Sequence, residues 1–168
     1  FFFKQKTAYE MIKMHPTYSY KLIQGSPLIR ESIKIAVLQH HERLDGSGYP
    51  LGKKGPNIHP FAKIIAVADT FHAMTSARIY RKKESPFKVL EMMEQDQFGK
   101  FDLKAIKALQ SGLVIFSIGS KVKLSNGQLA EIIFTDEKNP TRPLVKEMET
   151  GEMINLQSHL DLYIDEVL

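Results

Sequence analysis

The feature that most constrains this fold is a change in hydrophobic periodicity after Gly112. Before it, apolar side chains recur at helical spacing in several segments, separated by Gly- and Pro-rich stretches. After it, apolar and polar residues alternate in short runs, as in half-buried strands. We therefore predict a mainly α chain, with a helical domain over residues 12–112 and a small β accessory module over residues 113–168.

The helical spacing predicts five helices, over residues 12–24, 27–41, 61–75, 85–96 and 102–112. Pro27 is expected to open the second, because proline is favoured at the first helical position. Asp102 and Gly112 are expected to cap the two ends of the last. In the β module, Asn126-Gly127 predicts a hairpin. A second hairpin within 142–156 and a final strand within 161–168 complete the expectation.

Composition narrows the chemistry. The chain contains no cysteine, which excludes disulfides and thiolate-bound zinc. No apolar run reaches the length of a membrane span, and no signal peptide is evident, so a cytoplasmic protein is expected. The net charge of +4 is mild, and no basic block alternates with aromatics in the manner of a nucleic-acid interface. A nucleic-acid polymer is therefore not an expected partner.

Histidines gather at the end of the second predicted helix, where His40 and His41 are adjacent. Neighbouring helical residues point about 100° apart, so two adjacent histidines inside a helix do not face a single ion. Both can bind metal where the helix unravels at its end, or where two ions lie side by side. His15 offers a third imidazole. Asp69 falls inside the apolar segment 61–75, where a buried carboxylate needs a partner. Imidazole and carboxylate together suit iron, manganese or zinc.

Other interpretations of these residues remain open. His15 taken alone fits a surface or capping role. Asp69 can be a core acid paired with Arg78 or Lys63. His72 lies three residues after Asp69, on the same helix face, and can donate a hydrogen bond to the acid in place of binding metal.

The segment after the paired histidines is rich in glycine. Gly46 and Gly48 allow the backbone to approach a ligand closely, and Tyr49 offers a ring and a hydroxyl. Placed directly after two candidate ligands, the loop is expected to form one wall of a pocket. The basic segment 78–83 is either a solvated helix end or a phosphate clamp, since arginine binds phosphate oxygens in pairs.

The stretch "HHERLDGSGYP" at 40–50 resembles the signature of the HD-GYP family, a branch of the HD-domain metal-dependent phosphohydrolases. "HP" before it and "IHPFAKIIAVADTFHAMTSARIYR", "SPFKVLEMM" and "FGKFD" after it follow the family in order, so the resemblance covers residues 12–111. It implies an HD-type helical bundle holding two or three divalent metals, often iron or manganese. The implied activity is hydrolysis of cyclic di-GMP to pGpG or GMP, by a metal-bound hydroxide.

Matching positions carry the family's roles onto this sequence. The implied metal ligands are His15, His40, His41 and Asp69. The implied nucleotide contacts are Tyr49, Arg78 and Arg81, beside the glycines Gly46 and Gly48.

One part of the family pattern is absent. Its His-Asp pair, a lysine and a further histidine precede the "HP" element, yet residues 1–14 contain neither His nor Asp. The resemblance therefore implies a partial bundle, no catalytic side chain beyond the metal-bound hydroxide, and little activity for this chain alone. Residues 1–11 are expected to be foreign or disordered, because "KQKTAYE" can be encoded by a common sequencing-adapter oligonucleotide. The alternative is that "FFF" begins a real apolar helix.

Three functions stay open from sequence. The first is the cyclic di-GMP phosphodiesterase. The second is an HD hydrolase acting on a different cyclic dinucleotide. The third is a non-catalytic module that binds a cyclic dinucleotide or a protein, and a homodimer or a signalling protein remains an open partner.

Overall fold

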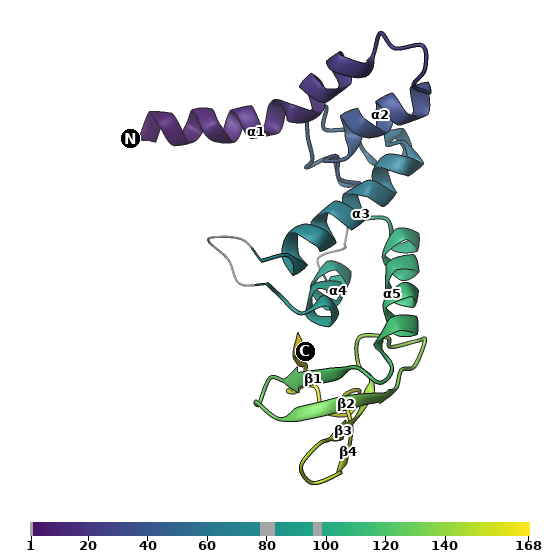
Figure 1. Ribbon diagram of the computed structural model, residues 1–168. Coiled ribbons are helices and arrows are strands. Elements are labelled where there is room, and N and C mark those ends of the chain that lie inside the picture. The colour runs from purple at the N-terminus through teal and green to yellow at the C-terminus, as the bar shows by residue number, and fades with distance from the viewer. Residues whose placement is uncertain (1, 78–82, 96–98) are drawn as a thin grey trace. The chain divides into compact units, whose positions relative to one another are not determined.

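The computed structural model describes residues 2–77, 83–95 and 99–168. These form two compact units (Figure 1). We call residues 2–69 and 99–105 the site unit, and residues 70–77, 83–95 and 106–168 the sheet unit. Over the described ranges, none of the helices combines the length and apolar character needed to cross a bilayer.

The predicted class, helices followed by a small β module, is confirmed. The α-helices are α1 (Phe2–Ile23), α2 (Glu31–Gln39), α3 (Pro60–Thr75), α4 (Pro86–Gln95) and α5 (Leu103–Ser117), with a short 3₁₀ turn η1 (Gly55–Asn57). The strands are β1 (Lys121–Leu124), β2 (Leu129–Phe134), β3 (Leu144–Glu147), β4 (Met153–Asn155) and β5 (Ile164–Val167).

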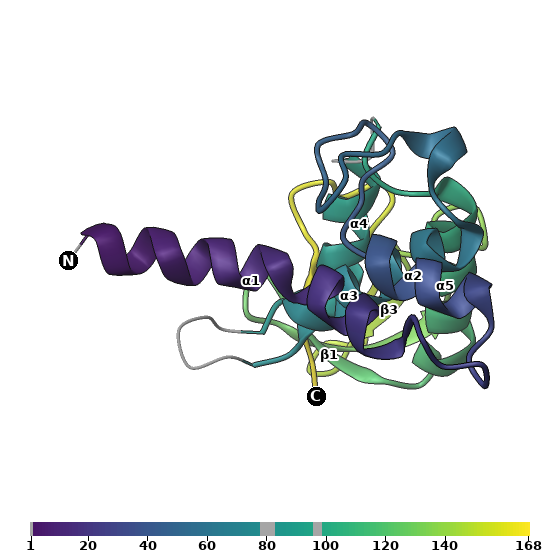
Figure 2. The same cartoon turned by 90° about the horizontal axis from the view of Figure 1, so that it is seen from above.

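Helix α1 begins ten residues earlier than the expected residue 12 and runs without interruption through residues 2–11. Figure 2 shows its first half extending beyond α2. The foreign origin of residues 1–11 stays a prediction, because helical geometry carries no information about where a coding sequence came from. Pro16 lies inside this helix.

Helix α2 corrects the expected start at Pro27. It begins at Glu31, after Arg30 in an extended conformation (φ −60°, ψ 143°). The preceding residues form a turn in which the Leu28 N–H donates to Ser26 Oγ at 3.3 Å. Leu28 is consequently 92% exposed rather than part of an apolar helix face. The Ser hydroxyl offers the backbone a local alternative to the helix.

Helix α5 confirms one predicted cap and overturns the other. Asp102 Oδ1 accepts the N–H groups of Lys104 and Ala105 at 3.0 and 3.1 Å, as an N-cap does. Gly112 does not end the helix, which continues to Ser117. Gly119, at φ +82°, is the glycine with the left-handed conformation that follows the true helix end.

The C-terminal strands form one antiparallel sheet in the order β4-β3-β2-β1-β5. Both predicted hairpins are confirmed, since β1 pairs with β2 and β3 pairs with β4, and β5 pairs with β1. Side chains alternate between the two faces, so Val122, Ile132 and Val145 are fully buried. Phe87 of α4 lies in the same hydrophobic cluster.

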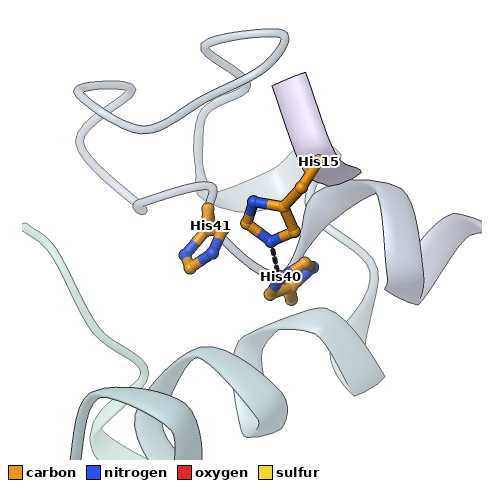
Figure 3. Close-up of side chains that lie close together, drawn as sticks. All are labelled: His15, His40 and His41. Atoms are coloured by element: carbon orange, nitrogen blue, oxygen red, sulfur yellow. Dashed lines mark hydrogen bonds between the residues drawn. The ribbon is translucent and has the colours of Figure 1, made fainter. Parts of the chain in front are cut away.

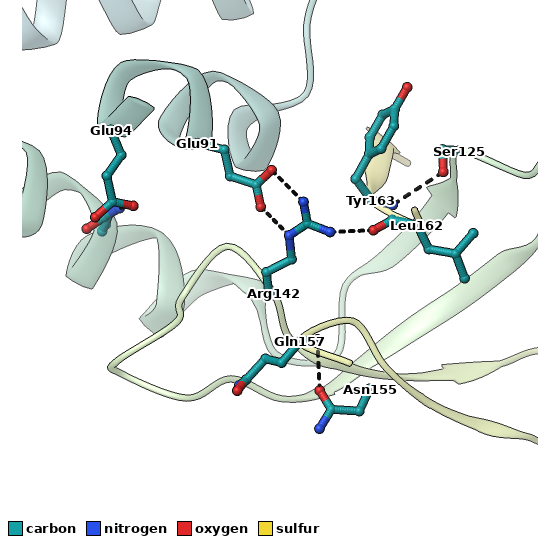
Figure 4. Close-up of polar contacts among 9 residues, drawn as sticks. Glu91, Glu94, Ser125, Arg142, Asn155, Gln157, Leu162 and Tyr163 are labelled. Carbon is teal, nitrogen blue, oxygen red and sulfur yellow. Dashed lines mark hydrogen bonds and ion pairs between the residues drawn. The ribbon is translucent and has the colours of Figure 1, made fainter. Parts of the chain in front are cut away.

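An ion pair also joins α4 to the strands. Arg142 donates through Nε and Nη2 to the two carboxylate oxygens of Glu91, at 2.5 and 2.9 Å, and through Nη1 to the carbonyl of Leu162 (Figure 4). A bidentate pair fixes orientation as well as distance. The compact sheet unit therefore contains α4 together with the strands.

Candidate metal centre

Three histidines converge in the site unit from separate parts of the chain (Figure 3). His15 comes from α1, His40 is the C-cap of α2, and His41 follows it in the turn. One ring nitrogen from each lies within 4.8 Å of the others. The helix ends at Gln39, and the rings of the two neighbouring histidines lie with their centroids 4.1 Å apart.

Backbone carbonyls determine the tautomers of two of these rings. His15 Nδ1 lies 2.6 Å from the carbonyl oxygen of Ile12, and His40 Nδ1 lies 2.7 Å from that of Val37. A carbonyl oxygen only accepts, so each Nδ1 must carry the proton. In the neutral rings both Nε2 atoms then present lone pairs. They face each other at 3.1 Å.

Two lone pairs at that separation repel unless a proton or a cation lies between or beside them. Two imidazole nitrogens that bind one ion at about 2.1 Å, roughly 90° apart, are themselves about 3 Å from each other. The donor set, its spacing and its tautomers therefore fit a divalent transition metal. Nδ1 donation to a backbone carbonyl is the usual support for a metal-binding histidine.

His41 is held differently. Its ring stacks on Tyr49, with centroids 4.7 Å apart and an interplanar angle of 26°. Burial, followed by the neighbouring His40, lowers the pKa of His41 from 6.5 to about 4. The imidazole is therefore neutral at neutral pH, which is the state a metal ligand requires.

Asp69 reaches the edge of this cluster. Its Oδ2 lies 3.9 Å from His41 Nδ1, and no hydrogen bond joins it to His72 in the described contacts. The expectation that α3 buries this acid is wrong, because the Asp69 side chain is 47% exposed. In the described residues α3 buries only Ala62, Ala66 and Val67, whereas Phe61, Ile64 and Ile65 are exposed. The role of Asp69 as a ligand stays a prediction.

The glycine-rich loop folds back onto His41, and its role as a pocket wall stays a prediction. The Tyr49 N–H donates to the His41 carbonyl at 3.2 Å. Gly48 is required by close approach, since a Cβ there would lie 2.4 Å from Arg43 N and 2.5 Å from His41 O. Gly46 adopts φ +85°, which disfavours other residues. The loop thus links a candidate substrate contact to a candidate ligand.

Glu42 supports the loop beside the site, and the sequence reasoning missed it. Its side chain is only 2% exposed, and its two oxygens accept the N–H groups of Leu51 and Lys53 at 2.7 and 2.9 Å. This carboxylate therefore closes the glycine-rich loop into a ring beside His41. The only available signal was an acid placed directly before the loop, and acids in loops are usually solvated.

The remaining predicted contacts, Arg78 and Arg81, lie outside the described residues. Arg43 is described. Its guanidinium lies 4.8 Å from the Phe101 ring centroid, and burial lowers its pKa. The Leu44 N–H donates to the Lys100 carbonyl at 2.9 Å. The segment around Phe101 therefore supports the loop from the side of α5.

Comparison with known proteins agrees with this geometry. The model of the HD domain family matches residues 5–104, and the chain belongs to that family. The cyclic di-GMP phosphodiesterases among its curated relatives support the HD-GYP branch within that family. Proteins with HD domains are metal-dependent, which accords with the three-histidine cluster.

Two curated relatives and one solved structure are similar. The cyclic di-GMP phosphodiesterase PdeB of Borreliella burgdorferi is 32% identical over 87% of this chain and 38% of its own length, so the match reaches into the C-terminal sheet. The 3'3'-cGAMP-specific phosphodiesterase 1 of Vibrio cholerae is 38% identical over 54% of this chain and 21% of its own. Bd1817, a HDG"Y"P protein from Bdellovibrio bacteriovorus, shares the fold at a TM-score of 0.52, with 21% identity over 62% of this chain and 32% of that one.

The chain thus spans 38% and 21% of the lengths of these two curated relatives.

Proposed function

We propose that the protein is a metal-dependent phosphodiesterase that hydrolyses cyclic di-GMP to pGpG or GMP in the cytoplasm, and that this chain supplies part of its metal centre and the substrate loop. The observation that carries the proposal is the pair of Nε2 atoms from His15 and His40, which face each other at 3.1 Å with both Nδ1 atoms committed to carbonyls. His41 and Asp69 are the further proposed ligands.

We propose two or three divalent ions, iron or manganese, for this centre. When bound, such ions activate water and stabilise the negative charge that develops on a phosphoryl group. The residues of this chain orient the donors. Carbonyls hold two imidazoles, and stacking on Tyr49 holds the third.

The substrate is proposed to lie against the glycine-rich loop. The Tyr49 ring suits a nucleotide base, Gly46 and Gly48 are proposed to lie beside it, and Arg78 and Arg81 are proposed to bind its phosphates. Cyclic di-GMP is preferred over another cyclic dinucleotide because the PdeB match covers the larger share of this chain.

The proposal is tested first by metal binding. The chain, loaded anaerobically with Mn²⁺ or Fe²⁺, is expected to bind metal and, in a metal-dependent way, cyclic di-GMP. His40→Ala should lower metal affinity by about 100-fold, since even loss of an orienting partner costs 10–100-fold. His159→Ala is the matched control, because His159 lies in the sheet unit and contacts only local groups.

Hydrolysis is the second test. The protein expressed from its complete gene should release pGpG or GMP, and a chelator should abolish the reaction. The 168-residue chain alone should turn over little. Metal-independent binding of cyclic di-GMP, with no hydrolysis by the complete protein, would instead support a non-catalytic receptor module.

A further inference from the structure

A proline lies in the interior of α1, where it ordinarily weakens a helix. Pro16 has no N–H, so the Ile12 carbonyl cannot receive its usual hydrogen bond from position 16. An interior proline costs about 3 kcal/mol relative to alanine. The Pro16 side chain is almost fully buried.

The carbonyl that Pro16 leaves free is the one that holds the first candidate ligand. His15 Nδ1 lies 2.6 Å from Ile12 O. With an N–H at position 16, the helix would place a competing donor on that oxygen. Without it, the imidazole becomes the donor, and its Nε2 is left to face His40 Nε2 at 3.1 Å.

The same arrangement recurs at His40 by a different route. Its Nδ1 lies 2.7 Å from Val37 O. Val37 belongs to the last turn of α2, whose carbonyls lack helical partners because the helix ends at Gln39. A missing helical hydrogen bond therefore orients each ring, through a proline in one case and a helix end in the other.

We propose that Pro16 is a positioning residue of the metal centre. By withholding a backbone N–H from Ile12 O, it makes His15 Nδ1 the hydrogen-bond donor and keeps His15 Nε2 available to a divalent cation. The inference rests on the proposed metal function, and it assigns a chemical role to the proline of the His15-Pro16 pair.

Pro16→Ala is the first test. The new amide at position 16 should bond to Ile12 O, so its hydrogen exchange should be slow, while the affinity of the chain for Mn²⁺ should fall about tenfold. A gain in helix hydrogen bonding with a loss in metal affinity is not expected of a residue that only stabilises the fold. Unchanged affinity would overturn the proposal.

A backbone ester separates the missing N–H from the lost ring. The α-hydroxy analogue of alanine at position 16 lacks both the pyrrolidine ring and the N–H. It should retain the Mn²⁺ affinity of the unaltered chain. The same tenfold loss in this variant would assign the effect to ring packing and contradict the proposal.

Pro60→Ala is the matched control in the same unit. Pro60 is the first residue of α3, where the missing N–H has no helical partner to lose, so Mn²⁺ affinity should not change.

The tautomer of the metal-free chain provides a readout that does not depend on metal. At a pH well above the ordinary histidine pKa, the His15 ring is neutral and carries one N–H proton. ¹⁵N NMR should find this proton on Nδ1 in the unaltered chain. In Pro16→Ala it should find a mixture of the Nδ1-H and Nε2-H tautomers. If the chain bound no metal yet showed this shift, the proposed function would fail, and with it the positioning of a metal ligand, while control of the His15 tautomer by Pro16 would stand. An unshifted tautomer would sink the role of Pro16 whatever the metal result.

Discussion

The site unit and the sheet unit bury their apolar residues very differently. In the sheet unit, Val122, Ile132, Val145 and Leu156 are completely inaccessible. In the site unit, Leu22 and Leu28 are more than four-fifths exposed, and the buried apolar residues of α2 and α3 are mostly alanines. The sheet unit is organised around a hydrocarbon core, whereas the site unit depends more on directed polar contacts.

Those polar contacts run from side chain to backbone. Glu42 holds the glycine-rich loop, and the side-chain Oε1 of Gln39 accepts the His59 N–H at 2.8 Å. Such contacts fix positions with little apolar burial behind them. The sheet unit therefore contributes most of the apolar burial that stabilises this chain, whereas the site unit uses its polar contacts to hold the histidines and the loop in place. Such a division is common where function requires exposed groups.

The largest expected effect comes from the core of the sheet. Ile132→Ala should lower the stability of the strands by about 3 kcal/mol, because it removes a fully buried side chain. Hydrogen exchange of strand amides measures it. Ile133→Ala, on the opposite face and partly exposed, is the control and should cost under about 1 kcal/mol. A parallel loss of Mn²⁺ affinity in Ile132→Ala would break the contrast between the units.

The second effect concerns the loop of the site unit. Gly48→Ala should destabilise the loop by about 2 kcal/mol, since the new Cβ meets backbone that cannot yield. Faster exchange of the Leu51 and Lys53 amides would report it. In Gly25→Ala nothing lies within 4 Å of the new Cβ, so the stability reported by the same two amides should change by no more than about 0.5 kcal/mol. Equal behaviour of the two variants would contradict the close approach at Gly48.

The third effect is a gain. Gly112→Ala should stabilise the sheet unit by about 0.5–1 kcal/mol, because Gly112 lies inside α5 with open space around its missing Cβ. Gly119→Ala should destabilise it, because Gly119 adopts φ +82°. Urea denaturation of both variants measures the pair, and the reverse ranking would restore Gly112 as the helix stop.

The smallest effect is a pH dependence in the sheet unit. Hydrogen bonds from the Thr150 hydroxyl, then from the Thr150 and Glu149 amides, lower the pKa of Glu147 below its ordinary 4.5. Its contribution to stability is therefore present above pH 4.5 and lost as pH falls through the lower folded value. The protection factor of the Thr150 amide, which corrects for the pH dependence of intrinsic exchange, should fall in the unaltered chain as the pH is lowered across that window. It should stay flat in Glu147→Gln, and a pH-independent unaltered chain would refute the prediction.

Local patterns predicted much of this molecule. Helical spacing located all five helices to within a few residues at most ends, and Asn126-Gly127 and the alternating runs located the strands. Neighbouring residues dominate these choices. Predicted helix ends were wrong at two places. At the start of α2, the Leu28 N–H bonds to Ser26 Oγ in a turn, and α5 continues past Gly112.

The sequence named candidate residues for the site and not their geometry. It singled out the adjacent His40 and His41, with His15 as a further candidate, and the structure brings one ring nitrogen of each within 4.8 Å of the others. The 3.1 Å approach of two Nε2 atoms, the burial of Glu42 and the exposure of Asp69 could not, since each depends on segments distant in the sequence. Periodicity reports which residues share a face of one element, and it carries no information about what lies against that face.

By itself, then, the order of residues determined the helices, the hairpins and the histidines present near residue 40. Only the tertiary structure decided which ring nitrogen each histidine has available for a metal ion, because that depends on which backbone carbonyls lack a helical partner and accept the other nitrogen's proton.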